Sequence, residues 1–204
     1  MLSEVDTVPV STNALAEKVQ AKPASASGML KQLADAGWVD HEAYRGVSLT
    51  ASGKSIAIDV IRRHRLWEVF LVERLGFRWD EVHDLAEQLE HIESTELIDK
   101  LDAYLGHPAY DPHGDPIPTS EGRLVDGRPL VVAECLLPGQ SAIIKGVVDS
   151  SDIFLRHLDH LNIRLGMQFH VSERHAFDGS AAIDGQGIWT AAVLKNIYVE
   201  IVKT

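Results

Sequence analysis

Residues 11–50 read STNALAEKVQAKPASASGMLKQLADAGWVDHEAYRGVSLT, and this stretch decides the fold of the N-terminal part of the chain. Ser11 precedes apolar residues at helical spacing, which predicts a short helix with a side-chain cap at its start. Pro23 interrupts that pattern, and Ser25 or Ser27 is expected to cap a second helix that runs to residue 36. The first half of the stretch therefore predicts two short helices.

The second half of the stretch predicts a hairpin. Gly37 stands where a left-handed residue commonly ends a helix. Residues 38–39 and 47–50 then favour two strands, separated by the polar turn at 44–46. Helix, turn, helix and hairpin follow one another as in a winged helix-turn-helix domain, which is a DNA-binding fold. A small helical domain without that function is the alternative.

Three helices are expected to follow the hairpin. The first is a long helix that begins at about Ser52, carries an apolar stripe and ends before Gly76. The second is predicted from about Asp80 to His91. A third is predicted for residues 94–105, with Ser94 as its cap and a Gly-His-Pro stop after it.

The remaining sequence changes character at a proline-rich stretch, residues 107–122, which reads as a linker or an ordered extended arm. Short β-type segments at 141–148, 168–172 and 198–202, with a helix at 152–161 between the first two, predict a small β-barrel without a catalytic motif. The expected fold is α+β and mainly α, with a winged helix-turn-helix at 1–58, a helical domain at 59–120 and a barrel at 121–204.

Composition and charge limit the possible functions of the 204-residue chain. A hydrophobic fraction of 45% with 24% charged residues excludes a disordered or collagen-like chain. A single cysteine and the lack of an apolar run of about 18 residues favour a cytoplasmic protein that does not enter a membrane. The net charge is −11, but Lys and Arg number 8 against 7 acidic residues in 1–65, 3 against 13 in 66–120, and 8 against 10 in 121–204. The near-neutral N-terminal part therefore remains compatible with a DNA partner.

The acidic middle segment places histidines and glutamates at helical spacing. Two His–Glu pairs stand four residues apart, and another Glu and His follow at spacings of three and four, so each set shares a helix face. Two such helices packed together would gather ligands as helix bundles do. The candidate metal ligands are His64, Glu68, His83, Glu87, Glu90 and His91.

This set of oxygen and imidazole donors contains no thiolate, which suits Mn²⁺ or Fe²⁺ better than a structural Zn²⁺ site. Glutamates at these spacings also occur on solvated helix faces, so spacing alone leaves other functions open. One is a winged-helix regulator that senses an organic ligand. Another is a di-metal hydrolase, although the sequence has no nucleophile motif and no glycine-rich phosphate loop.

Two segments, VIRRHRLWE at 60–68 and VHDLAEQLEH at 82–91, resemble the signature of the DtxR/MntR family of metal-dependent transcriptional repressors. Shorter segments agree in the same order along the chain. They are VSTNALA (10–16) and YRGVSLT (44–50), similar to the family's DNA-binding domain, GDPIP (114–118), similar to the end of its dimerisation domain, and FLRHL (154–158), similar to its FeoA-like SH3-type barrel.

The resemblance implies a homodimeric repressor of metal-uptake genes that binds a pseudo-palindromic, double-stranded operator when it holds a divalent metal. It implies one ligand set of His64 and Glu68, with His83 in part of the family, and another of Glu87, Glu90 and His91. Iron-sensing members have Cys at the position of Glu87 and manganese-sensing members have Glu, which favours Mn²⁺ over Fe²⁺ here. Family members also carry a ligand on an earlier helix, and Met1 stands only ten residues before Ser11, so we expect an upstream start or a site completed by water.

The expected recognition helix covers about residues 25–33. Its N-terminal residues are small, so we expect DNA binding to depend on phosphate contacts and on DNA shape more than on base contacts. The expected DNA contacts are Thr12, Lys22, Ser25, Ser27, Gly28 and Lys31, with Tyr44 and Arg45 at the tip of the wing.

Overall fold

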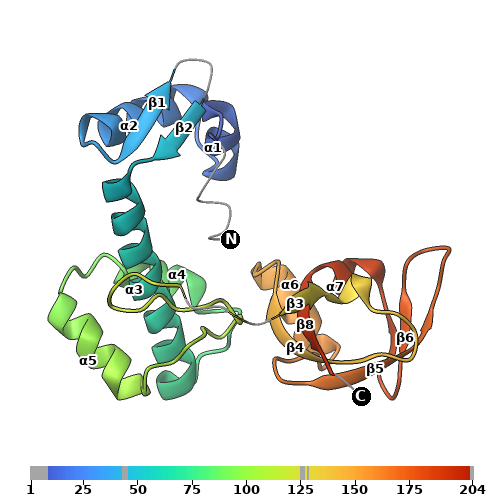
Figure 1. The fold of residues 1–204 in the computed structure, drawn as a ribbon. Helices are drawn as coiled ribbons and strands as arrows, with labels where there is room; N and C mark the ends of the chain where they lie inside the picture. The colour runs from blue at the N-terminus through green and yellow to red at the C-terminus, as the bar shows by residue number, and fades with distance from the viewer. Residues whose placement is uncertain (1–8, 43–45, 125–126, 128, 203–204) are drawn as a thin grey trace. The chain divides into compact units, whose positions relative to one another are not determined.

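The computed structural model describes residues 9–42, 46–124, 127 and 129–202, and the chain forms two compact units, residues 1–61 and 62–204 (Figure 1). α1 (Thr12–Lys18) opens the described part of the first unit, and the Oγ of Ser11 caps it by accepting from the backbone N–H of Ala14 at 3.2 Å. β1 (Val39–Glu42) and β2 (Gly46–Leu49) form the predicted antiparallel hairpin. The small core of this unit comprises Leu30, Val39 and Val47, packed against Leu15, Leu33, Ala34 and Leu49.

α2 (Pro23–Asp35) begins differently from the prediction. Its N-cap residue is Lys22, without a side-chain cap, and Pro23 takes the first helical position, where its missing N–H costs nothing. The expectation that Ser25 or Ser27 caps this helix is wrong, because both lie inside it. The Ser27 hydroxyl donates to the Pro23 carbonyl at 2.9 Å, one turn earlier.

α3 (Ala51–Leu75) contains the boundary between the two units. α4 (His83–Leu89) is shorter than the predicted helix at 80–91. The carboxylate of Asp80 pairs with Arg78 and Arg156 instead of capping a helix, so the chain turns before α4 begins. α5 (Thr95–Leu105) agrees with the prediction, because Ser94 caps it and Gly106 ends it with a φ of 80°.

The proline-rich stretch is an ordered arm up to at least residue 118. A β-bridge joins Tyr110 to Pro116, and Ile117 is buried against the helices. The helical core that it joins consists of Leu66, Trp67, Val69, Leu71, Val82, Ala86, Ile98, Leu101 and Leu105.

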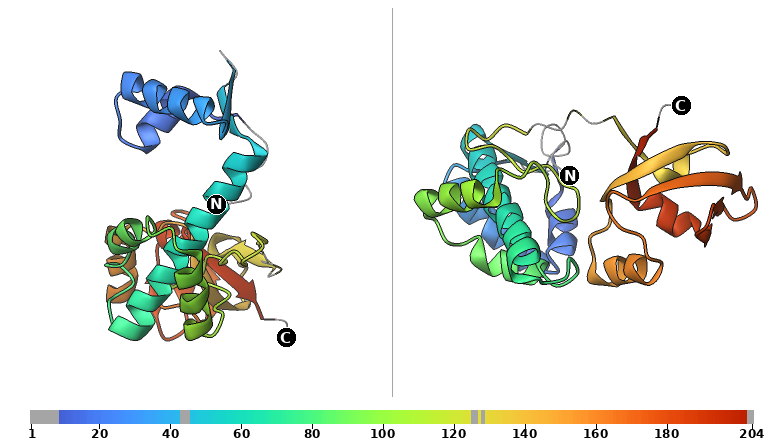
Figure 2. Two further views of the ribbon diagram at one scale, coloured as in Figure 1. Left: turned by 90° about the vertical axis from the view of Figure 1, so that its left-hand side faces the viewer. Right: turned by 90° about the horizontal axis from the view of Figure 1, so that it is seen from below.

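The C-terminal domain, residues 130–202, is built on a six-stranded antiparallel sheet in the order β3-β8-β4-β5-β6-β7, seen from two further sides in Figure 2. Its strands are β3 (Leu130–Val132), β4 (Ser141–Val147), β5 (Gln168–Arg174), β6 (Ala181–Ile183), β7 (Gly187–Trp189) and β8 (Ile197–Ile201). The helices are α6 (Asp152–His160), α7 (Ala191–Lys195) and the 3-10 turn η2 (Ala133–Cys135). The three predicted strands correspond to β4, β5 and β8, whereas the strands of three residues are too short to show alternation.

The core of the C-terminal domain lies between this sheet and its helices. Phe169 and Trp189 pack with their ring centroids 4.7 Å apart, and Val193 and Leu194 of α7 complete the interior. Within the described residues, none of the helices has the length and apolar character needed to cross a membrane.

Candidate metal centre

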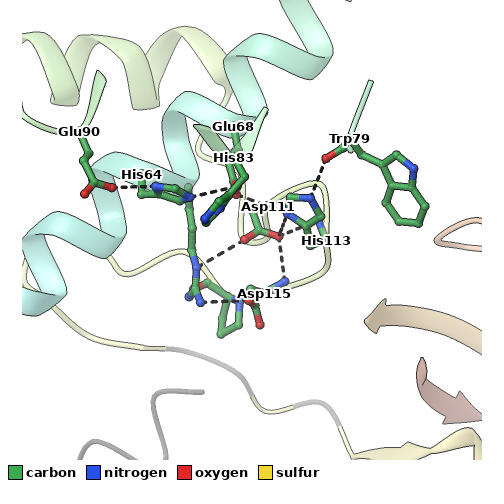
Figure 3. Close-up of polar contacts among 10 residues, drawn as sticks. His64, Glu68, Trp79, His83, Glu90, Asp111, His113 and Asp115 are labelled. Carbon is green, nitrogen blue, oxygen red and sulfur yellow. Dashed lines mark hydrogen bonds and ion pairs between the residues drawn. The ribbon is translucent and has the colours of Figure 1, made fainter. Parts of the chain in front are cut away.

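His64 and Glu68 lie one turn apart on α3, on the side that faces the helical core. Glu68 is only 2% exposed, and its Oε1 lies 3.0 Å from Nε2 of His64 (Figure 3). The other ring nitrogen of His64, Nδ1, lies 2.7 Å from Oε2 of Glu90. His64 therefore connects two carboxylates that stand 22 positions apart in the sequence.

His83, the first residue of α4, approaches the same carboxylate from a second helix. Its Nδ1 lies 3.7 Å from Oε1 of Glu68, and its ring packs edge-on to that of His64 with centroids 4.9 Å apart. Most of the His83 side chain is exposed. The α3–α4 pairing thus brings two imidazoles to one buried carboxylate oxygen.

The arm at 107–118 brings a third imidazole. Oδ1 of Asp111 accepts from the backbone N–H groups of His113 at 2.8 Å and Asp115 at 3.0 Å, which folds the arm into a tight turn. This turn places Nδ1 of His113 3.5 Å from Oε2 of Glu68 (Figure 3). Nε2 of His113 lies 2.9 Å from the carbonyl oxygen of Trp79, and because a carbonyl only accepts, Nε2 carries the hydrogen.

Sequence reasoning missed Asp111 and His113. Both lie in the proline-rich stretch, for which the sequence predicts a linker or an ordered arm, and outside any periodic pattern. The available signal was the segment Asp-Pro-His-Gly-Asp at 111–115, in which two carboxylates and an imidazole stand next to the turn residues proline and glycine.

Burial and ion pairing act against each other at this centre. Burial alone would raise the pKa of Glu68, but hydrogen bonds from His113, His64 and His83 hold that pKa well below its usual range. For His113, burial opposes the charged form, yet the neighbouring Glu68 and Asp111 carboxylates raise its pKa to about 9. Burial, followed by the charge of Glu68, raises the pKa of Asp111. Pairs of imidazolium and carboxylate groups therefore hold these side chains together.

The donor atoms fit a divalent cation. Two groups of three residues can each hold an ion, because the possible ligand atoms within each group all lie within 4.8 Å of one another. The groups are His64–Glu68–His83 and Glu68–Asp111–His113, and Glu68 belongs to both. An ion with bonds of about 2.0–2.2 Å spans donors at such separations, and imidazole and carboxylate ligands suit Mn²⁺, Fe²⁺ or Zn²⁺. Each of His64 and His113 also uses its second nitrogen to contact a carboxylate or a carbonyl, as metal-bound histidines usually do.

The other predicted ligands are less closely assembled. Glu90 contacts His64, but Glu87 and His91 are exposed, and neither belongs to a group of ligand atoms within 4.8 Å among the described residues. The charge of Glu87 contributes to the raised pKa of His83, after the larger contributions of Glu68.

Most of the predicted DNA contacts lie on or beside α2. Ala26 and Leu30 form the buried side of this helix, and the predicted contacts on it are exposed. Thr12 begins α1 and is partly exposed, whereas Tyr44 and Arg45 lie outside the described residues. The exposed contacts in this part of the chain are Lys22, Ser25, Ser27, Gly28 and Lys31.

Two family models match the chain. Residues 1–47 match the iron dependent repressor N-terminal DNA binding domain, and residues 50–119 match the iron dependent repressor metal binding and dimerisation domain. Among curated proteins, the iron-dependent repressor IdeR of Mycobacterium tuberculosis is 42% identical over 74 residues, which cover 36% of this chain and 32% of that protein. The IdeR of Mycobacterium leprae is 34% identical over 51% of this chain and 45% of that protein. The chain thus spans less than half the length of these relatives.

Solved structures match over nearly the whole chain. A manganese-dependent transcriptional repressor in complex with manganese is 38% identical, with a TM-score of 0.84, and the match covers 98% of this chain and 95% of that one. The manganese regulator SloR is 31% identical, with a TM-score of 0.77 over 98% and 93% of the two chains. ScaR with bound Zn²⁺ is 30% identical, with a TM-score of 0.78 over 98% and 95%.

Proposed function

Because the chain belongs to the family of iron-dependent repressors, we propose that it is a homodimeric repressor that binds its operator when it holds Mn²⁺ or Fe²⁺. The observation that carries the metal part is the buried carboxylate of Glu68, which three histidines face. The operator that we propose is double-stranded and pseudo-palindromic, because a two-fold symmetric dimer meets two equivalent half-sites. The protein acts in the cytoplasm, where it reaches DNA, and represses genes of metal uptake.

The proposed ligands fall into two sets. His64, Glu68 and His83 form one centre, to which Asp111 and His113 add ligands, with His113 at the other oxygen of the Glu68 carboxylate. Glu87, Glu90 and His91 form the second, and the contact between Glu90 and His64 links it to the first. A bound divalent ion would supply the positive charge that these carboxylates require.

Mn²⁺ is the cofactor that we favour over Fe²⁺. The proposed donors are oxygens and imidazole nitrogens, and a thiolate would be expected in a site built for a softer metal. Glu87 stands at the position where iron-sensing family members carry Cys. Competition between the two ions for the purified protein under anaerobic conditions tests this preference.

On DNA, α2 serves as the recognition helix in this proposal, and its exposed side carries Lys22, Ser25, Ser27, Gly28 and Lys31. Thr12 lies at the start of α1, and Tyr44 and Arg45 belong to the proposed wing tip. Lys31→Ala should weaken binding to all sequences alike and lower the salt dependence by about one phosphate contact.

Metal and DNA are proposed to act through linkage. A metal that binds better to the DNA-competent state must raise the DNA affinity by the same factor by which DNA raises the metal affinity. The ligands His64 and Glu68 stand on α3, the helix whose first turns belong to the DNA-binding unit. This continuous helix gives the linkage a direct structural route.

A gel-shift titration with and without Mn²⁺ tests the proposal. We expect tight binding with Mn²⁺, weak binding in EDTA, and loss of the metal response in Glu87→Ala and His91→Ala with the fold retained. Glu93→Ala, an exposed glutamate just beyond His91, is the matched control and should respond like the wild type. Equal DNA affinity in EDTA and in Mn²⁺ would overturn the proposal.

A further inference from the structure

A buried carboxylate joins the helical region to the C-terminal domain. Asp80 is 3% exposed and accepts from Nε of Arg78 at 2.9 Å and from Nε of Arg156 at 2.7 Å. Arg156 lies on α6 of the C-terminal domain, and Arg78 also contacts Asp159 of the same helix at 3.0 Å. Charge-assisted hydrogen bonds of this length to a buried carboxylate are strong contacts. We call Arg78, Asp80 and Arg156 the Asp80 clamp.

The residue next to Asp80 holds the ring of His113. The carbonyl of Trp79 accepts from Nε2 of His113 at 2.9 Å, which directs Nδ1 toward Glu68. The Trp79 ring lies nearly parallel to the His113 ring, at 12° with centroids 6.3 Å apart, and it also packs against the core of the C-terminal domain. The segment that forms the clamp therefore also sets the orientation of this imidazole.

The C-terminal domain contacts the main chain of the same histidine. The backbone N–H of Val147 in β4 donates to the carbonyl of His113 at 3.0 Å. The next residue, Gly114, lies so close to the backbone of Lys145 and Gly146 that no side chain fits between them. His113 is thus held through its ring by Trp79 and through its backbone by β4.

We propose that Asp80 is a positioning residue for metal binding, because the clamp docks the C-terminal domain and this docking holds His113 with Nδ1 aimed at Glu68. None of the three clamp residues belongs to the groups of possible ligand atoms. Since the same contacts orient the imidazole and join the two regions, metal binding and docking favour each other by a shared factor. The inference rests on the proposed function in one respect, which is that His113 binds the metal.

Amide hydrogen exchange in the full-length protein, with Mn²⁺ as the probe, tests this linkage. Because the N–H of Val147 donates to the carbonyl of His113, stronger docking in the presence of Mn²⁺ should slow its exchange by about fivefold or more. The N–H of Ile144 donates to Met167 inside the C-terminal domain at 3.0 Å and serves as the internal control. Its exchange should not respond to Mn²⁺.

Variants of the clamp give the second half of the test. Asp80→Asn should weaken Mn²⁺ binding by about 5- to 20-fold and abolish the metal effect on Val147, and Arg156→Gln should do the same from the other side. Asp80→Glu keeps the charge and should restore part of both. Asp152→Asn is the matched control, because Asp152 is an exposed second partner of Arg156 at 3.4 Å and lies outside the clamp.

The possible outcomes separate this inference from the proposed function. If the wild type binds neither Mn²⁺ nor Fe²⁺, both fail. If the wild type binds Mn²⁺ but its Val147 exchange does not change, or Asp80→Asn and Arg156→Gln bind Mn²⁺ as the wild type does, only the role of Asp80 is overturned. Unchanged exchange at Ile144 shows that a weakened variant has kept its C-terminal fold.

Discussion

At the scale of single residues, the proposed metal centre depends most on Glu68, because it belongs to both groups of possible ligand atoms. Glu68→Gln keeps the shape of the side chain but removes its charge. Loss of a residue that only hydrogen-bonds to a metal ligand typically weakens metal binding by about 10- to 100-fold. We expect Glu68→Gln to weaken Mn²⁺ binding by more than this. Titration calorimetry measures the change. Glu73→Gln, an exposed glutamate on the same helix, should bind as the wild type does, and near-wild-type binding by Glu68→Gln would exclude it as a ligand.

The lowered pKa of Asp80 predicts that the stability of the fold depends on pH. Burial opposes its ionisation, but Arg156 and Arg78 lower its pKa below the ordinary value near 4. A carboxyl group with a lowered pKa stabilises the fold above its unfolded pKa, and this contribution is lost as the pH falls through the folded pKa. The two arginines also feel other carboxylates, because Glu81 and Asp159 act on Arg78 and Asp152 acts on Arg156.

The wild type should therefore be more stable than Asp80→Asn at pH 7, and the difference should shrink below about pH 4. Urea unfolding of the metal-free proteins at pH 7, 5, 4 and 3 measures it. A difference that stays constant across this range would show that the Asp80 charge does not stabilise the fold.

Which ligands the sequence can predict depends on how far apart they stand along the chain. His64 and Glu68 share a helix face through their spacing alone, so local periodicity is enough to pair them. His113 stands 45 positions after Glu68, and their contact requires the path of an irregular arm. No period describes such an arm, so this part of the centre becomes visible only in the folded structure.

At the scale of secondary-structure elements, boundaries depend on what the terminal side chains contact. The prediction of Ser94 as a cap is confirmed, since its Oγ accepts from the backbone N–H of Leu97 at 3.3 Å. Asp80 would also suit a helix start, but two arginines engage its carboxylate, one of them 76 positions away. α4 begins only at His83, so a side chain that suits a helix start locally is engaged by a partner that the local sequence does not contain.

The contact between the arm and β4 can be tested with two glycines. Gly114 and Gly139 have similar φ values, 90° and 86°, but a Cβ on Gly114 would collide with the β4 backbone, whereas one on Gly139 would meet no atom within 4 Å. Gly139→Ala should cost only the left-handed strain of about 1–2 kcal/mol. Gly114→Ala should cost more and also speed Val147 exchange. Urea unfolding compares the two, and equal costs would show that the arm is not packed tightly against β4.

At the scale of the whole molecule, the excess of acidic residues lies in the same segment as the proposed metal ligands. Residues 66–120 hold 13 acidic against 3 basic side chains, and they contain most of the proposed ligands. Mutual repulsion among these carboxylates destabilises the metal-free protein, so bound cations should stabilise this region strongly. The net charge of −11, which on its own argues against a DNA partner, is better explained as a property of the metal-binding region.

The linkage between metal and DNA gives a quantitative prediction for the whole molecule. If Mn²⁺ raises the affinity for a duplex by some factor, that duplex must raise the affinity for Mn²⁺ by the same factor, because the two paths form one thermodynamic cycle. We expect a factor of about 5 to 150, measured with a duplex selected from a random pool in the presence of Mn²⁺.

Fluorescence anisotropy gives the DNA affinity with Mn²⁺ and with EDTA, and calorimetry gives the Mn²⁺ affinity with and without the duplex. In Glu68→Gln both factors should fall toward one together. A large effect of Mn²⁺ on DNA binding that persists in this variant would show that the ion acts outside the Glu68 centre.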